Sequence, residues 1–164
     1  MFFVRTASIR DAEKVQQLLV ETWHATYDAI HGADFVDEIC QTWHSVENIK
    51  TNIDARDGEY VVADSGDEIG GMAFVKSPNK DGNAYLSQIY VRPDLQRQGI
   101  GRDLMNEVEN CFPEAKNLRL GVDSKNLNAA NFYEHIGYKN TGISFEDTIS
   151  DRAIEALVFE KPLP

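Results

Sequence analysis

Residues Gln96 to Gly101, which read Gln-Arg-Gln-Gly-Ile-Gly, have the composition of an anion-binding turn. They lie between an expected strand over residues 85–91 and an expected helix that starts beyond the glycines. Glycines let the backbone approach a ligand closely, and the start of a helix presents unpaired N–H groups with a partial positive charge. The turn therefore predicts a site for a phosphate or a pyrophosphate.

Two familiar phosphate motifs do not match this turn. A Walker loop needs Lys and then Ser or Thr after its last glycine, whereas Arg102 and Asp103 follow here. The dinucleotide fingerprint needs a third glycine where this chain has Leu104. On spacing alone, a tight strand-to-helix turn without a ligand explains the glycines equally well.

A second segment, residues 120–133, follows the next expected strand, and the two segments together resemble the GNAT superfamily of acetyl-CoA-dependent N-acetyltransferases. After its fourth strand that family carries Gln/Arg-x-x-Gly-x-Gly/Ala, matched here by Gln96, Gly99 and Gly101. After its fifth strand it often carries Asn-x-x-Ala-x-x-Phe-Tyr, matched by Asn126, Ala129, Phe132 and Tyr133. The pattern from residue 120 to residue 142 also looks like that of bacterial spermidine/spermine acetyltransferases.

The resemblance implies that acetyl-CoA is the cosubstrate and that it enters a wedge between strands 85–91 and 118–122. Main-chain N–H groups around the glycines would hold its pyrophosphate; the residues are Gln96, Arg97, Gln98, Gly99, Ile100 and Gly101. Backbone groups of Ile89, Tyr90 and Val91 would pair with the pantetheine arm as an added strand would. Asn126 would hydrogen-bond the same arm, and no metal is implied.

Tyr133 is the expected general acid, because family members often place a tyrosine here to protonate the coenzyme A sulfur. A thiol has a pKa near ~8.5 and a phenol near ~10, so the two groups differ modestly. The general base stays open. Many members use a glutamate on the fourth strand, where this chain has Ser87 and Gln88. His24, Asp28 and His31 follow the expected first helix, in the segment where the family forms its acceptor site, and none of them is assigned as the base.

Hydrophobic spacing predicts the elements that position these residues. Val15, Leu18, Leu19, Thr22 and Trp23 mark one face of a first helix, with further helices near residues 35–43 and 46–53. Strands are expected at residues 2–6, 59–64, 69–75, 85–91, 118–122, 138–144 and 154–159. The order of these helices and strands is typical of the α+β fold class, which some schemes call α/β. The resemblance implies a mixed, mostly antiparallel seven-stranded sheet with helices on both faces and a splayed parallel pair, 85–91 and 118–122, within one domain over residues 1–164.

Charge excludes some classes of partner. The 16 basic and 27 acidic side chains give a net charge of −11, which disfavours nucleic acid and an anionic membrane surface. Only residues 92–102 are locally basic, with Arg92, Arg97 and Arg102 against Asp94, and we expect coenzyme A to dock there. No apolar run approaches the roughly 20 residues of a membrane span, and two cysteines need no disulfide framework, so a cytoplasmic location is expected.

The acceptor is expected to be a primary amine, and the acidic chain favours a small cationic amine or polyamine, attacking acetyl-CoA directly in a ternary complex. The segment Phe145-Glu146-Asp147 and Asp151, expected between the last two strands, would present carboxylates to it. Two alternatives stay open: a protein N-terminal or lysine acetyltransferase acting on a peptide acceptor, and an acyl-CoA-binding module that transfers nothing. The two C-terminal strands could also pair across a two-fold axis in a homodimer.

Overall fold

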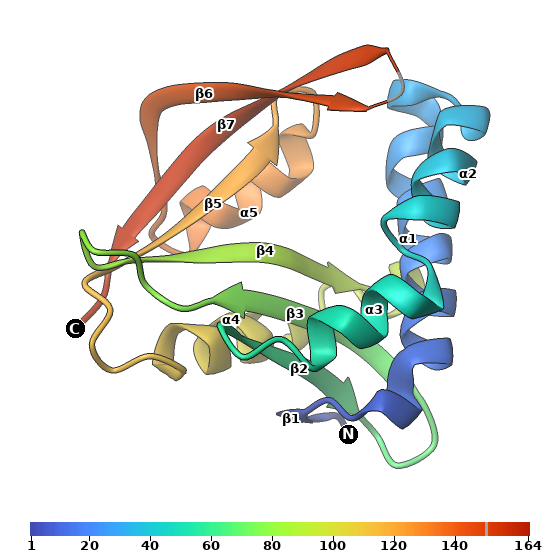
Figure 1. Ribbon diagram of the computed structural model, residues 1–164, viewed down its shortest axis with the longest axis horizontal. Coiled ribbons are helices and arrows are strands. Elements are labelled where there is room, and N and C mark those ends of the chain that lie inside the picture. The colour runs from blue at the N-terminus through green and yellow to red at the C-terminus, as the bar shows by residue number, and fades with distance from the viewer. Residues whose placement is uncertain (150) are drawn as a thin grey trace.

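The computed structural model describes residues 1–149 and 151–164, and seven strands form one sheet in the order β1-β2-β3-β4-β5-β7-β6 (Figure 1). The strands are β1 Phe3–Thr6, β2 Gly58–Asp64, β3 Ile69–Lys76, β4 Asn83–Val91, β5 Asn117–Asp123, β6 Lys139–Ile149 and β7 Arg152–Pro162. The helices are α1 Ala12–His31, α2 Ala33–Thr42, α3 Val46–Ile53, α4 Ile100–Asn110 and α5 Leu127–His135. Among the strands that the structure describes, only β4 and β5 pair in parallel, so the predicted mixed, mostly antiparallel sheet is confirmed.

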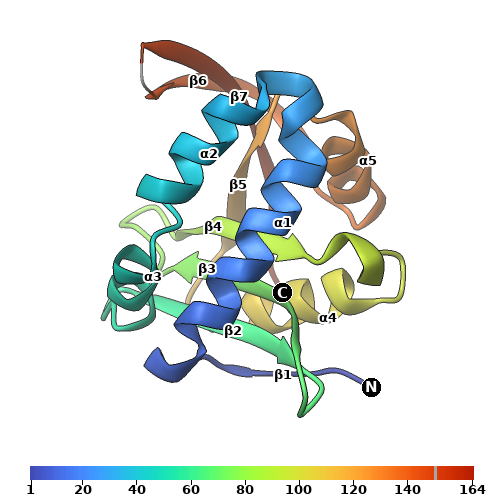
Figure 2. The same ribbon diagram turned by 90° about the vertical axis from the view of Figure 1, so that its right-hand side faces the viewer.

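Helices cover both faces of the sheet, as predicted (Figure 2). On one face α4 and α5 pack through residues such as Leu104 and Met105 against alternate residues of β2 to β5. On the other face α1 and α3 pack against Tyr60, Val62 and Met72. The apolar spacing along the first helix is the cause, because its five predicted residues are all buried. None of the described helices is long and apolar enough to span a membrane.

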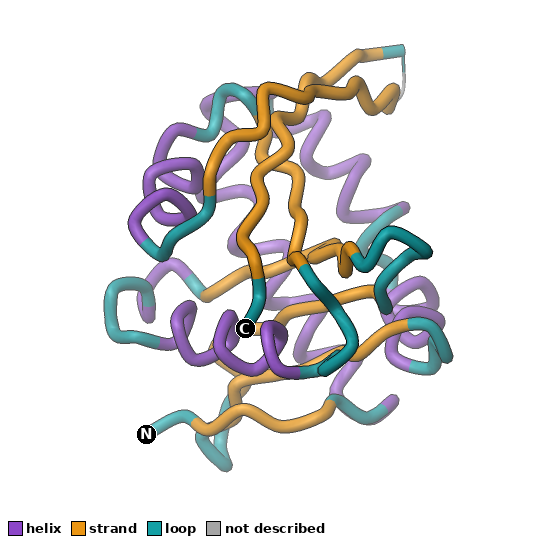
Figure 3. The backbone as a smooth tube through the Cα atoms, turned by 90° about the vertical axis from the view of Figure 1, so that its left-hand side faces the viewer, coloured by secondary structure: helices purple, strands orange, loops and turns teal. Residues whose placement is uncertain are grey.

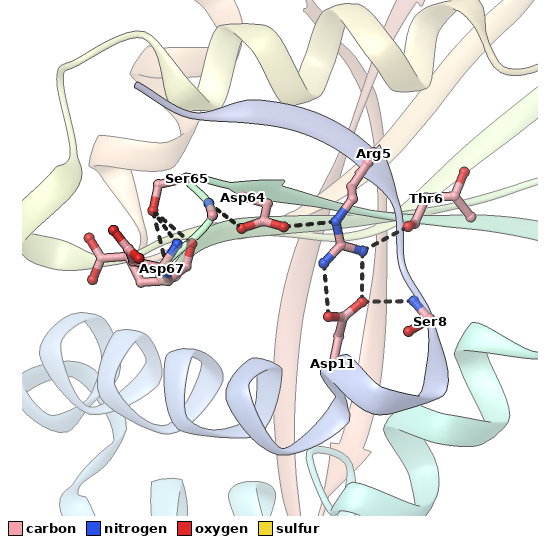
Figure 4. Close-up of polar contacts among 9 residues, drawn as sticks. Arg5, Thr6, Ser8, Asp11, Asp64, Ser65 and Asp67 are labelled. Atoms are coloured by element: carbon pink, nitrogen blue, oxygen red, sulfur yellow. Dashed lines mark hydrogen bonds and ion pairs between the residues drawn. The ribbon is translucent and has the colours of Figure 1, made fainter.

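The start of α1 is fixed to the sheet by an ion-pair network (Figure 4). The Arg5 guanidinium donates to both carboxylate oxygens of Asp11 at 2.9 Å, and its Nε donates to Asp64 at 2.9 Å. The backbone N–H of Ser8 donates to Asp11 at 2.8 Å, which is a capping interaction with Asp in place of the usual Glu. β1, β2 and α1 therefore meet at one charged contact.

Two expectations about the ends of elements were wrong. α1 continues to His31, so His24, Asp28 and His31 lie on its last turns rather than after it. β6 and β7 are each 11 residues long, so Phe145, Glu146 and Asp147 lie within β6 instead of between the strands. Their length lets Ile149 and Ile154 at the far end of the hairpin pack against α1 and α2.

Candidate active site

β4 and β5 separate halfway along their length, and this separation creates the site. Their parallel pairing runs only from Asn83 with Asn117 to Leu86 with Leu120. Beyond Leu86, β4 pairs with β3 alone, and beyond Leu120, β5 pairs with β7 alone. Gln88 lies opposite Phe74 while Leu86 lies opposite Val75, so Ser87 is an extra residue that bends β4 where the strands part. Figure 3 shows the two halves of the sheet running in different directions.

A cleft of about 1170 Å³ occupies the space between the separated strands. Its walls come from α1, β4, the turn before α4, β5 and α5. Residues 87–91 of β4 face it with a strand edge that has no partner on the β5 side among the described strands. An extended ligand can therefore hydrogen-bond to this edge as an added strand does.

The glycine turn closes one end of the cleft with an anion-binding geometry. Gly99 precedes α4 with φ of 91°, a left-handed conformation that favours glycine, and Arg97 also has a positive φ of 64°. The first N–H groups of α4 have no partners within the helix, and they carry the partial positive charge of its N-terminus. Arg97 and Arg102 line the cleft, whereas Arg92 points elsewhere and pairs with Glu68 and Asp94.

Most of the predicted coenzyme-binding residues lie around this one cleft. Nine of them line it: Ile89, Tyr90, Val91, Gln96, Arg97, Gly99, Gly101, Asn126 and Tyr133. Gln98 and Ile100 are not among its lining residues, and the Ile100 side chain is 5% exposed within the core. The side chain of Gln96 donates to the carbonyl of Val91 at 3.1 Å, which fixes the end of β4 to the turn.

Tyr133 lies on α5 with its ring packed edge-on against Phe132 and Tyr138. It is 9% exposed and lines the cleft, and its hydroxyl makes no hydrogen bond to any residue that the structure describes. Burial, and then the neighbouring Tyr27, raise the pKa of Tyr133 well above its usual value. The phenol is therefore neutral at pH 7 and keeps a proton to donate, but it gives that proton up less readily than a phenol in water.

Asn126 connects the cleft to α1. Its side-chain oxygen accepts from the backbone N–H of Ala129 at 3.2 Å and so caps α5, and its amide nitrogen donates to the Tyr27 hydroxyl at 3.2 Å. The hydrogen bond from Asn126 to pantetheine stays a prediction. The contacts present give this residue a second role, which is to hold Tyr27 at the wall of the cleft.

The contact between Asp123, which lines the cleft, and His31 of α1 was missed from the sequence. Asp123 ends β5 and lines the cleft, and its Oδ2 lies 2.6 Å from Nε2 of His31, the last residue of α1. Both side chains are 9% exposed. The position of Asp123 after a parallel strand was a usable signal, since ligands bind beyond the carboxyl ends of such strands. His31 was named in the expected acceptor segment, but nothing indicated its pairing with Asp123, which is 92 residues away in the chain.

The other early histidines do not converge with this pair. His24 bonds Asp28 at 2.7 Å and Asp37 at 2.9 Å on the outside of α1 and α2, and the hydrogen bond to Asp28 is the largest cause that raises its pKa. His44 is 1% exposed, and neither ring nitrogen has a partner among the described residues. Within residues 1–149 and 151–164 no group of three or more His, Cys, Asp and Glu is placed to hold a metal.

Comparison with known proteins adds three findings. Residues 25–150 match the family model described as an acetyltransferase (GNAT) domain. The chain is 26% identical to the peptidyl-lysine N-acetyltransferase YjaB of Salmonella typhimurium, with 91% of each chain covered. It is 23% identical to a spermidine N(1)-acetyltransferase of Thermoplasma acidophilum, over 93% of this chain and 98% of the relative.

Solved structures agree in fold. The crystal structure of PaiA N-acetyltransferase from Thermoplasma acidophilum in complex with coenzyme A superposes with a TM-score of 0.83, at 23% identity and 99% coverage of both chains. The ribosomal-protein-S18-alanine N-acetyltransferase of Escherichia coli superposes with a TM-score of 0.72, at 20% identity, over 99% of this chain and 94% of that one. At these identities the likeness establishes the arrangement of the elements.

Proposed function

This chain belongs to the GNAT family of acetyltransferases, and we propose that it moves the acetyl group of acetyl-CoA to the primary amine of a small cationic acceptor. N-acetyl transfer with acetyl-CoA as cosubstrate is the activity of the family, and it replaces the alternative of a module that only binds acyl-CoA. The cleft between β4 and β5 carries the proposal, because it joins a strand edge, a helix N-terminus and the Tyr133 hydroxyl. The proposal treats residues 1–164 as one N-acetyltransferase domain.

The described residues fit coenzyme A in three ways. The N–H groups of residues 98–101 and the side chains of Arg97 and Arg102 match the charge of a pyrophosphate. The free edge of Ile89, Tyr90 and Val91 matches the alternating amides of a pantetheine arm. The Oγ1 of Thr22 lines the opposite wall, buried and without a partner among the described residues, so a polar group in the cleft can satisfy it.

The reaction follows from where these groups lie. The cosubstrate supplies a thioester whose carbonyl carbon accepts the amine nitrogen. A backbone N–H of β4 donates to the thioester carbonyl oxygen and stabilises the charge that develops there. Tyr133 gives its proton to the departing sulfur as the C–S bond breaks, because burial keeps the phenol protonated until a strong base forms beside it. Both substrates must therefore be bound in the cleft at the same time.

A cationic acceptor is favoured by charge. The chain has a net charge of −11, and an acidic protein concentrates cations near its surface. A relative that acetylates spermidine supports a polyamine, and a relative named a peptidyl-lysine N-acetyltransferase supports a second candidate, the lysine side chain of a peptide. Both acceptors present a primary ammonium group on a flexible alkyl chain.

Product analysis separates the two acceptors. The purified chain is incubated with acetyl-CoA and, in parallel, with spermidine, spermine, a peptide carrying one lysine and a blocked N-terminus, and a peptide carrying a free N-terminus. Mass spectrometry reads the gain of one acetyl group. Acetylation of the polyamines in preference to both peptides supports the proposal, and preference for either peptide replaces it with the second class.

Two further parts of the proposal concern location and assembly. A cytoplasmic site of action is supported by Cys40 and Cys111, which are both free. Pairing of two copies along β6 is supported by its place at the edge of the sheet and by the exposed side chains of Ile143 and Phe145. Light scattering coupled to gel filtration gives the mass in solution and decides between one copy and two.

A further inference from the structure

We propose that Asp123 accepts the proton of the acceptor ammonium group, and that His31 holds the Asp123 carboxylate in position and carries the proton away. The inference rests on the proposed N-acetyltransferase function and supplies the base that β4 lacks. Ser87 and Gln88, the polar residues of β4 in the cleft, are not bases. Among the cleft residues Asp123 is the one carboxylate.

The contacts of Asp123 leave it able to bind an ammonium group. Its Oδ1 accepts from the backbone N–H of Lys125 at 2.9 Å, and its Oδ2 bonds Nε2 of His31 at 2.6 Å. A carboxylate has about four acceptor positions on its two oxygens, so these two bonds fix its orientation without exhausting it. Asp123 is therefore an oriented anion at the wall of the cleft.

The carboxylate lies within electrostatic reach of the reacting groups. Burial first, and then the charge of Asp123, raise the pKa of Tyr27. Burial is also the main cause that raises the pKa of Tyr90, followed by Tyr27 and Tyr133, and the charge of Asp123 adds the smallest contribution. Tyr27 in turn contributes to the raised pKa of Tyr133. Asp123 and Tyr133 line the same cleft, so an amine that binds beside Asp123 shares that cleft with the tyrosine that we expect to protonate the leaving sulfur.

His31 is held by groups from its own helix, α1, and from two other elements, α2 and β7. Tyr27, one turn earlier on α1, stacks on the His31 ring with the ring centroids 5.7 Å apart. The ring of Phe35 on α2 packs against His31 with the centroids 5.5 Å apart. Arg152 of β7 donates to its backbone carbonyl at 2.6 Å. The ring thus has a fixed position, which a residue that orients another must have. The charged groups around the pair are Lys125 on the cleft side and Arg152 on the hairpin side.

The protons and bonds balance as follows. The ammonium group gives one proton to Asp123, and its nitrogen lone pair then forms the N–C bond to the thioester carbonyl carbon. The C–S bond breaks and the sulfur takes the hydroxyl proton of Tyr133. The nitrogen loses a second proton, which restores Tyr133, and Asp123 passes the first proton through His31 to solvent. The products are the amide, the free thiol and one released proton.

Asp123→Asn tests the base, because it keeps the shape and loses the charge. We measure kcat/KM for spermidine and for the lysine peptide from pH 7 to pH 10. At pH 7 it should fall about 100-fold or more, and the loss should shrink towards pH 10, where a larger fraction of the amine, whose pKa is about 10, is already neutral. Asp34→Asn, on an exposed residue at the start of α2, removes the same charge outside the cleft and should change kcat/KM less than about twofold.

Two outcomes overturn the inference. A loss that is equal at every pH assigns Asp123 a structural or binding role only, and an unchanged kcat/KM removes it from the reaction. Thermal-shift measurement with and without acetyl-CoA shows whether the variant is folded and binds the cosubstrate. If the wild-type chain acetylates neither probe, the proposed function fails first, and that result is distinct from a defect confined to the variant.

His31 is tested as a positioning residue through its partner. His31→Ala should lower kcat by about tenfold with little change in KM for the amine, and His31→Gln, which restores a donor toward Asp123, should recover part of that loss. In an Asp123→Asn background His31→Ala should add almost nothing, because the two residues act as a unit. Independent, multiplicative losses in the double variant would contradict the pairing.

Discussion

Leu86 of β4 lies beside Leu120 of β5 as the last pair of the parallel ladder, and the two strands separate around the cleft beyond this pair. Both side chains are buried, at 4% and 1% exposed, so the ladder ends inside the core. The extra residue Ser87 follows at once and bends β4 away. The point where the two strands separate is thus firmly packed, which allows the proposed ligand contacts on β4 and the proposed proton-transfer groups on β5 and α5 to keep fixed positions.

Tyr133→Phe should lower kcat for amine acetylation by about 100-fold at pH 7, because the departing sulfur loses its proton donor. The affinity for acetyl-CoA, measured by calorimetry, should change little, since the ring and its packing remain. Tyr138→Phe is the matched control, because its hydroxyl bonds Glu109 on α4 outside the cleft. Equal turnover of the Tyr133 variant and the wild type would remove Tyr133 from the reaction.

Gly99 and Gly101 should respond differently to alanine. Gly99 has φ of 91°, so Gly99→Ala should lower the free energy of unfolding by about 1 kcal/mol or more, although no atom lies within 4 Å of the added Cβ. At Gly101 the added Cβ meets Phe132 at an ordinary 3.4 Å, so stability should hold while a methyl group enters the cleft and weakens coenzyme A binding. Urea unfolding and calorimetry measure the two quantities. The reverse assignment of the two effects would contradict this geometry.

His44 should make the protein less stable in mild acid. Burial lowers the pKa of His44 from 6.5 to about 4. Between pH 6.5 and pH 4 the imidazole is therefore protonated in the unfolded chain but neutral in the folded chain. Stability should therefore fall as the pH drops from 6.5 to 4, by up to about 3 kcal/mol from this residue. His44→Leu should flatten that part of the stability profile measured by urea unfolding. An unchanged slope would show that the imidazole is solvated.

Asp11 should contribute to the pH dependence of stability at lower pH than His44 does. The hydrogen bonds from Arg5 hold the pKa of Asp11 below its usual value, so this contribution is present above about pH 4 and is lost as the pH falls through the lowered pKa. Asp11→Asn should cost about 1–2 kcal/mol of unfolding free energy at pH 7 and progressively less in acid. The exposed Asp57→Asn should cost little at either pH. A constant difference between Asp11→Asn and the wild type would mean that charge is not the cause.

Local patterns predicted the elements well for identifiable reasons. Val15, Leu18 and Leu19 repeat with the helical period because one face of α1 is buried, and that regularity is visible in any short window. The turn before α4 was found because Gly99 needs a positive φ and a side chain-free approach. Nine of the predicted coenzyme-binding residues line one cleft because they come from two short segments at the ends of neighbouring strands.

Contacts between residues far apart in the chain could not be predicted from the sequence. The His31–Asp123 pair joins the end of a helix to the end of a strand. No local sequence pattern around either residue predicts that the two come into contact. Arg92 was counted with Arg97 and Arg102 from charge alone, but its guanidinium is directed to Glu68 and Asp94 by the path of the chain after β4. The length of β6 was underestimated because all of its residues before Ile149 are exposed. The strand therefore lacks the alternation of buried and exposed residues by which a strand is recognised.

Release of free thiol from acetyl-CoA, followed continuously while spermidine or the lysine peptide is added, tests the central claim most directly. We expect release that depends on the amine, saturates in both substrates and matches acetylated product one for one, with a rate that falls about 100-fold in Tyr133→Phe. Acetyl-CoA binding without any amine-dependent release of thiol, across polyamines and peptides alike, would contradict the assignment of the cleft between β4 and β5 as the place of transfer.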